Sequence, residues 1–140
     1  MNKLLTAALL ISVHSAVLAP AAHAQSVSEK DGRLADTSGR TLYTFDKDSA
    51  NTSACNADCA TMWPPFAAAD GAKAKGDFGL VARSDGIQQW SYKSKPLYYF
   101  SGDTQPGETK GEGMGGVWHT VGTAAKRSAP SGYDTIRGNY

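Results

Sequence analysis

The residues best suited to chemistry are two cysteines and one histidine. Cys55 and Cys59 are four positions apart, and His119 is the only histidine after His23. On one helical turn, this cysteine spacing brings the two Cα atoms within disulfide range. The two thiols, His119 and the thioether of Met114 would together also form a soft ligand set for copper. The sequence therefore offers two hypotheses: a structural disulfide or a copper site.

The first residues predict the compartment in which these cysteines lie. Lys3 precedes a short apolar run at 4–18, and Ala22-His23-Ala24 then forms a small-x-small cleavage site. These features are typical of a secretory signal peptide over residues 1–24, and the run is shorter than the ~20 residues of a membrane span. We expect cleavage after Ala24, giving a periplasmic or secreted chain with neither a membrane span nor a lipid-accepting cysteine. Nearby cysteines usually pair outside the cytoplasm, so the disulfide is favoured and copper is the alternative.

Charge and motif content argue against several function classes. Lys3 is one of the 14 basic residues and lies in the signal peptide, so the mature chain balances its remaining basic residues against 13 acidic ones. A neutral chain gives no reason to expect nucleic acid or an anionic membrane as a partner. The sequence has no nucleophile elbow and no H-E-x-x-H pattern, and Asp46-x-Asp48 lacks the glycine and the final Glu of a calcium loop. We therefore expect no enzymatic activity and no cofactor.

A pattern that occurs twice indicates which elements position these residues. Leu-Tyr-x-Phe-x-x-Asp occupies 42–48 and recurs 55 residues later at 97–103, and each copy is followed by a tryptophan at the same distance. The repeated residues are Tyr43, Phe45, Asp48 and Trp63 in one unit, and Tyr98, Phe100, Asp103 and Trp118 in the other. Two copies are too few for a solenoid. We expect one pseudo-symmetric domain with repeats at about 31–66 and 85–121.

Strand and turn residues dominate both units. Aromatic and β-branched residues flanked by Gly, Ser, Asn and Asp are typical of β-hairpins. The expected hairpins pair residues 33–36 with 41–45, and residues 87–92 with 96–100. A further strand is expected at 78–83, and Ser53 is expected to cap a short helix around the cysteines that Pro64 terminates. The predicted fold is mostly β: a small antiparallel domain of two hairpin units over 25–122, with a loosely ordered tail at 123–140.

The repeated residues have a structural and a functional interpretation. Alternate positions of a strand share a face, so the tyrosine and phenylalanine of each unit are expected to enter the core together. Asp48 and Asp103 follow where each strand should turn, and an aspartate there can accept N–H groups of the next loop. Alternatively, the same side chains could form a groove for a small ligand or an envelope component.

The order of these elements resembles a known family. Over about residues 31–121, the chain is similar to the bacterial secreted-repeat proteins, often described as predicted lipoproteins with a Tyr-x-(Phe/Trp/Tyr)-x-x-Asp motif. The matching elements are Tyr43-Thr44-Phe45 with Asp48, Cys55 to Ala60, Trp63-Pro64-Pro65, Arg83-Ser84-Asp85-Gly86 with Gln88, Pro96-Leu97-Tyr98, Asp103 with Pro106-Gly107, and Trp118. The resemblance implies a cell-envelope protein of unknown function. We expect a non-enzymatic binding or interaction module; the alternative is a periplasmic copper-binding or redox accessory protein.

Overall fold

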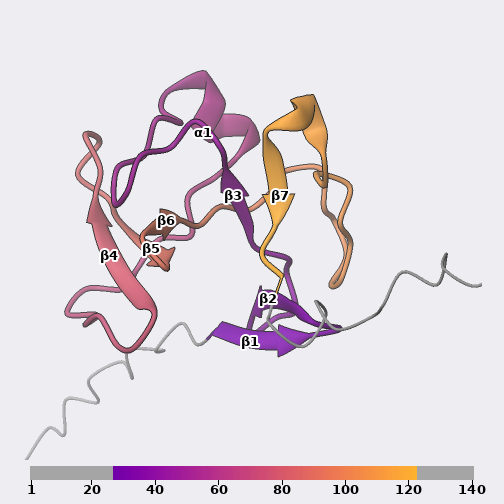
Figure 1. Cartoon of the computed structure of the whole chain (residues 1–140), viewed down its shortest axis with the longest axis horizontal. Helices are drawn as coiled ribbons and strands as arrows, with labels where there is room; N and C mark the ends of the chain where they lie inside the picture. The colour runs from indigo at the N-terminus through magenta and orange to yellow at the C-terminus, as the bar shows by residue number, and fades with distance from the viewer. Residues whose placement is uncertain (1–26, 123–140) are drawn as a thin grey trace, which may run out of the picture.

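The computed structural model describes residues 27–122 (Figure 1). The expected signal peptide at 1–24 and the expected tail at 123–140 lie outside the described residues. The elements are β1 (Val27–Lys30), β2 (Arg33–Asp36), β3 (Tyr43–Phe45), α1 (Asp58–Met62), β4 (Phe78–Ala82), β5 (Gln88–Tyr92), β6 (Lys95–Pro96), the 3-10 turn η1 (Met114–Gly116) and β7 (Trp118–Thr120).

The strands form three small antiparallel sheets: β1–β2, β3–β7 and β4–β5–β6. This arrangement confirms the expected fold class, with a short helix beside the cysteines. The predicted strand at 78–83 is β4, and the second predicted hairpin is β5 with β6, whose turn places Lys93 and Ser94 at positive φ. The second strand of this hairpin is shorter than the predicted 96–100, because beyond Pro96 only Tyr98 pairs, through isolated bridges to Tyr43 and Pro65.

The first predicted hairpin is only partly formed. β2 pairs along its length with β1, a strand that was not predicted from the sequence. β2 meets the following segment through a single bridge between Ala35 and Thr41. β3 pairs instead with β7, so that Phe45 lies opposite Trp118. This pairing places the aromatic side chains of both units in one cluster, and the burial of their apolar surface favours it.

The helix begins later than predicted, and Ser53 does not cap it. Ala57 is the N-cap of α1, and no side chain bonds to the helix N-terminus. The Ser53 hydroxyl points instead toward the tyrosine of the other unit, 2.8 Å from the Tyr98 hydroxyl. α1 ends at Met62, before Pro64, where a helix termination was expected.

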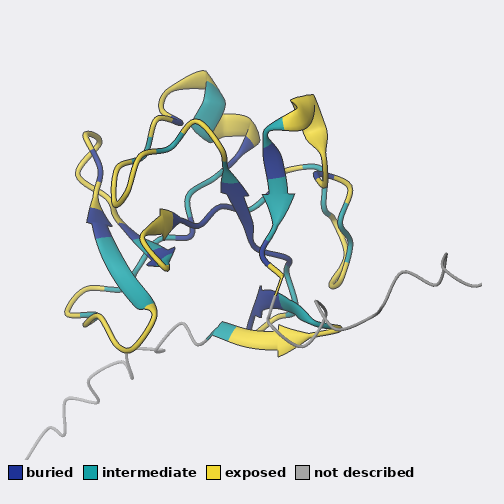
Figure 2. Ribbon diagram, in the orientation of Figure 1, coloured by how far each residue is buried: buried dark blue, intermediate teal, exposed yellow. Residues whose placement is uncertain are grey.

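Two apolar clusters form the core, shown as buried segments in Figure 2. The first consists largely of repeated residues from both units: Tyr43, Cys55, Trp63, Tyr98, Phe100 and Trp118. The second is aliphatic apart from one phenylalanine: Leu34, Leu42, Phe66, Leu97 and Val121. Gly111 lies against the first cluster, and a Cβ there would lie 2.6 Å from the Trp63 ring. Only glycine lets the backbone approach so closely.

The backbone hydrogen bonds show that the two units are related by an approximate two-fold symmetry. At its centre, Tyr43 and Tyr98 each donate an N–H to the other's carbonyl, and both distances are 2.9 Å. Asp46 donates to the Val117 carbonyl at 2.9 Å, and 55 residues later Ser101 donates to the Met62 carbonyl at 2.9 Å. Each motif strand therefore runs beside the tryptophan segment of the other unit.

Candidate functional site

The two repeated tryptophans stack on each other at the centre of the molecule. Their ring centroids are 3.8 Å apart and their planes differ by 3°. Each tryptophan also meets the tyrosine of its own unit edge-on, at 5.4 Å for Tyr43–Trp63 and 5.2 Å for Tyr98–Trp118. The other face of each tryptophan is covered by the phenylalanine of the opposite unit, Phe100 on Trp63 and Phe45 on Trp118. The stack thus joins the two repeats.

The repeated tyrosines and aspartates are also bonded across the units. The Tyr43 hydroxyl donates to Asp103 Oδ2 at 2.6 Å, and the Tyr98 hydroxyl donates to Asp48 Oδ2 at 2.8 Å. The second oxygen of each aspartate holds the loop that follows its own strand, accepting the Ala54 N–H in one unit and the Lys110 N–H in the other. Each aspartate therefore fixes its own loop and the other unit's tyrosine.

Burial shifts the ionisation of these groups toward their neutral forms. Desolvation raises the pKa of Tyr43 and of Tyr98 well above the usual value, and the hydrogen bond to a carboxylate raises each further. Burial also raises the pKa of Asp48, although hydrogen bonds from Ala54 and Tyr98 partly oppose it. Both phenols are hydrogen-bond donors to carboxylates at neutral pH and are engaged in holding the fold.

Removing either aspartate should destabilise the domain. Asp48→Ala and Asp103→Ala each remove the carboxylate that accepts from a tyrosine hydroxyl and from a loop N–H, so we expect each to lower the free energy of unfolding by about 1–3 kcal/mol. Asp→Asn should cost less because one acceptor oxygen remains. Urea denaturation measures these changes, and Asp77→Ala, at an exposed site, is the matched control. The structural role would be contradicted if the two alanine variants were as stable as the control.

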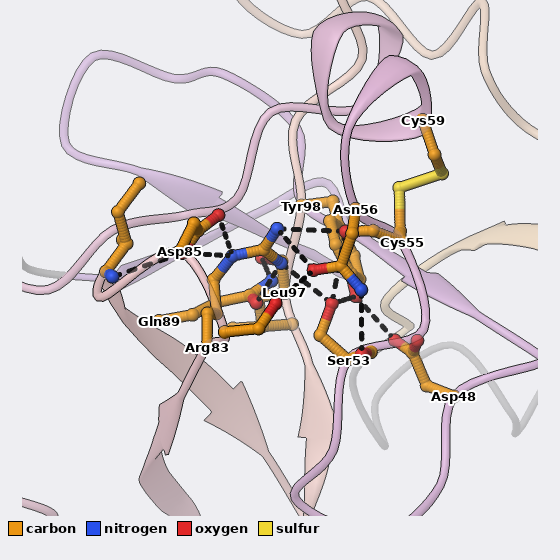
Figure 3. Close-up of polar contacts among 12 residues, drawn as sticks. Asp48, Ser53, Cys55, Asn56, Cys59, Arg83, Asp85, Gln89, Leu97 and Tyr98 are labelled. Atoms are coloured by element: carbon orange, nitrogen blue, oxygen red, sulfur yellow. Dashed lines mark hydrogen bonds and ion pairs between the residues drawn. A yellow bond between two sulfur atoms is a disulfide. The ribbon is translucent and has the colours of Figure 1, made fainter.

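A buried arginine joins the second unit to the cysteine loop of the first (Figure 3). The Arg83 side chain has no exposed surface, and its Nε atom contacts Asp85 at 3.0 Å. Its other nitrogens donate to the Ser53 hydroxyl, Gln89 Oε1, the Cys55 carbonyl and Asn56 Oδ1. In the sequence, Arg83 stands out only as part of the family motif Arg83-Ser84-Asp85-Gly86, which does not indicate its role. The family motif was the sequence feature that could have drawn attention to Arg83, because the position of this residue in the sequence does not indicate its five partners.

The cysteines of this loop are joined to each other. The Cys55–Cys59 disulfide closes the segment that leads into α1, and Cys55 is fully buried. Because both sulfurs are in this bond, the copper hypothesis requires a reduced form of the protein. Within residues 27–122, no cluster of three or more His, Cys, Asp or Glu residues is arranged to hold a metal ion.

The one histidine of the described segment lies between two carboxylates. His119 Nε2 is 3.0 Å from Asp46 Oδ2, and His119 Nδ1 is 3.4 Å from Glu112 Oε1. Burial alone would raise the pKa of Glu112, but hydrogen bonds from Thr120 and His119 bring it below its usual value. The positions equivalent to these three residues are Ser101, Ala57 and Pro64, so the cluster exists on one side only.

The two connections between motif and tryptophan carry exposed apolar side chains. Met62 in α1 is 51% exposed, and Met114 in η1 is 39% exposed. Figure 1 shows α1 and the turn that leads into β7 at the same end of the molecule, and Figure 2 shows this end to be largely exposed. The residues equivalent to these methionines are Val117 and Cys59, so neither methionine is part of the repeated pattern.

The structure divides the candidate residues into two sets. The eight repeated residues and both cysteines contact one another in or around the core. Met114 and His119 lie on the surface, and His119 is bonded to carboxylates. The surface between the two connections is therefore the candidate site for a partner, because its side chains are not required by the repeated packing.

Comparison with known proteins gives one match. A protein-family model described as a secreted repeat of unknown function matches residues 25–67 and again residues 79–122. No curated protein and no solved structure matches the chain. Among the helices of residues 27–122, none has the length and apolar character needed to cross a membrane.

Proposed function

Because the chain belongs to a family of secreted repeats of unknown function, we propose that it is a non-enzymatic interaction module of the cell envelope, acting in the periplasm or outside the cell. The observation that carries this proposal is the contrast between the repeated residues and the two connections. The tyrosine, aspartate and tryptophan side chains with useful chemistry are bonded to one another inside the fold. The contact surface is assigned to the connections around Met62 and Met114.

The chemistry of this surface favours a protein partner with an apolar contact patch. Methionine is flexible and polarisable, so it adapts to the shape of another protein surface. The neighbouring side carries His119 with Asp46 and Glu112, which offer hydrogen-bonding groups at its edge. An apolar centre with a polar rim is the usual composition of a protein interface.

Photo-crosslinking in the producing cell tests this assignment. A photoreactive amino acid at Met62 or at Met114 should yield the same crosslinked envelope protein, because both positions belong to one contact surface. The matched control is Lys73, an exposed residue on the segment that joins the two repeats. The proposal predicts adducts at the first two positions and none at the third. An identical adduct pattern at all three positions, or no adduct at Met62 and Met114, would contradict it.

A further inference from the structure

Neither repeat completes its packing with its own residues. The Tyr43 hydroxyl needs Asp103, and the Tyr98 hydroxyl needs Asp48. The aliphatic cluster closes in the same way: Leu34 donates its N–H to the Val121 carbonyl at 2.9 Å, and Trp90 donates to the Phe66 carbonyl at 2.9 Å. In both pairs the end of one repeat closes on the hairpin of the other. Each repeat is therefore half of a closed unit.

The segment that joins the repeats is short and makes local contacts. Ala68, just before it, donates to the Gln88 carbonyl at 2.7 Å, and Lys75, just after it, pairs with Phe78. Between these anchors, residues 69–74 form a surface turn in which Ala72 donates to the Ala69 carbonyl. Asp70, Gly71, Lys73 and Ala74 are exposed. Opening this turn breaks few native interactions.

From these two observations we propose that the chain binds a second copy of itself by exchanging repeats about residues 69–74. In the exchanged dimer, the first repeat of each copy packs on the second repeat of the other copy. Every contact between repeats is kept, including the tryptophan stack and both tyrosine–aspartate bonds. The closed monomer and the exchanged dimer then differ mainly in the joining turn, so protein concentration decides between them. This inference does not depend on the proposed function.

The register of β3 and β7 provides a specific test. Thr44 lies directly opposite His119, and the two residues belong to different repeats. Opposed residues of an antiparallel pair have a Cα separation that permits a disulfide. In a mixture of two full-length variants, Thr44→Cys and His119→Cys, the two new thiols can face each other across β3 and β7 only if the repeats are exchanged between copies.

The two variants are unfolded together in denaturant, refolded at high concentration and oxidised. The expected product is a covalent heterodimer that reductant dissolves and whose yield rises with concentration. The matched control mixes Thr44→Cys with Gln88→Cys, because Gln88 is exposed and lies opposite Ala82 rather than Thr44. A heterodimer yield no greater than that of the control would overturn the proposal.

A second variant removes the joining turn without touching either repeat. Deleting residues 70–73 leaves only Ala69 and Ala74 between the anchors Ala68 and Lys75, and a shortened joining segment disfavours the closed monomer. Light scattering of the deletion variant should report a dimer or a larger assembly with native-like tryptophan fluorescence. A folded monomer would overturn the proposal. If the deletion variant does not fold, the cysteine mixture remains decisive because its chains keep the joining turn.

Discussion

Replacing Arg83 by alanine is expected to lower the free energy of unfolding by about 3–5 kcal/mol, because several acceptors bonded by its three nitrogens lose a donor, at about 1–3 kcal/mol for each one that is buried. Its Nε contacts Asp85, and its other two nitrogens reach the cysteine loop and β5. Removing the side chain leaves the Cys55 carbonyl and Gln89 Oε1 without this donor in a buried region. A cavity the size of the side chain adds to the loss.

Guanidinium denaturation measures the effect, and two variants separate its causes. Arg83→Lys keeps the charge but cannot reproduce the planar set of donors, so it should fall between wild type and Arg83→Ala. Asp85→Ala removes a partner whose side chain is 40% exposed and leaves the other four partners of the guanidinium in place, so it should cost less than Arg83→Ala. An Arg83→Ala variant as stable as Asp85→Ala would show that the network does not hold the two repeats together.

Alkaline pH is expected to unfold the domain more steeply than loss of surface charge would explain. Burial raises the pKa values of Tyr43, Tyr98 and Tyr99 above the value near 10 that they have when exposed. The folded state therefore holds protons that the unfolded chain releases above pH 10, so stability is fully present below that pH and falls as pH rises toward the folded pKa. Between pH 10 and the folded pKa, each fully buried phenol lowers the free energy of unfolding by about 1.4 kcal/mol per pH unit.

Tyr43 and Tyr98 are both fully buried. As the pH rises above about 10, the two phenols together should lower the free energy of unfolding by roughly 2.7 kcal/mol per pH unit. Absorbance at 295 nm measures the ionisation of the tyrosines, and near-ultraviolet circular dichroism measures the loss of tryptophan stacking. We expect the two signals to change together. Tyr98→Phe removes one titrating group and should reduce the slope by about 1.4 kcal/mol per pH unit. Ionisation of both phenols in a chain that remains folded would contradict this prediction.

The sequence alone was sufficient for features that depend on local chemistry and spacing. The repeated Leu-Tyr-x-Phe-x-x-Asp pattern predicted two equivalent units, and the four-residue spacing of Cys55 and Cys59 predicted their disulfide. These features could be predicted because strands, turns and short loops are encoded by neighbouring residues. The position of the helix start was missed because the Ser53 hydroxyl has partners in the other unit, which helix-capping rules do not consider.

Only the tertiary structure decided which unit supplies each partner. The two units have the same motif spacing, so the sequence does not distinguish bonds within a unit from bonds between units. Geometry makes the choice: β3 ends at Phe45, and the chain turns before Asp48, which donates its N–H to the Phe45 carbonyl. The antiparallel contact between Tyr43 and Tyr98 brings Asp103 beside Tyr43 instead. Three of the five partners of Arg83, Ser53, Cys55 and Asn56, likewise lie in a distant segment and become its neighbours only when the two repeats close on each other.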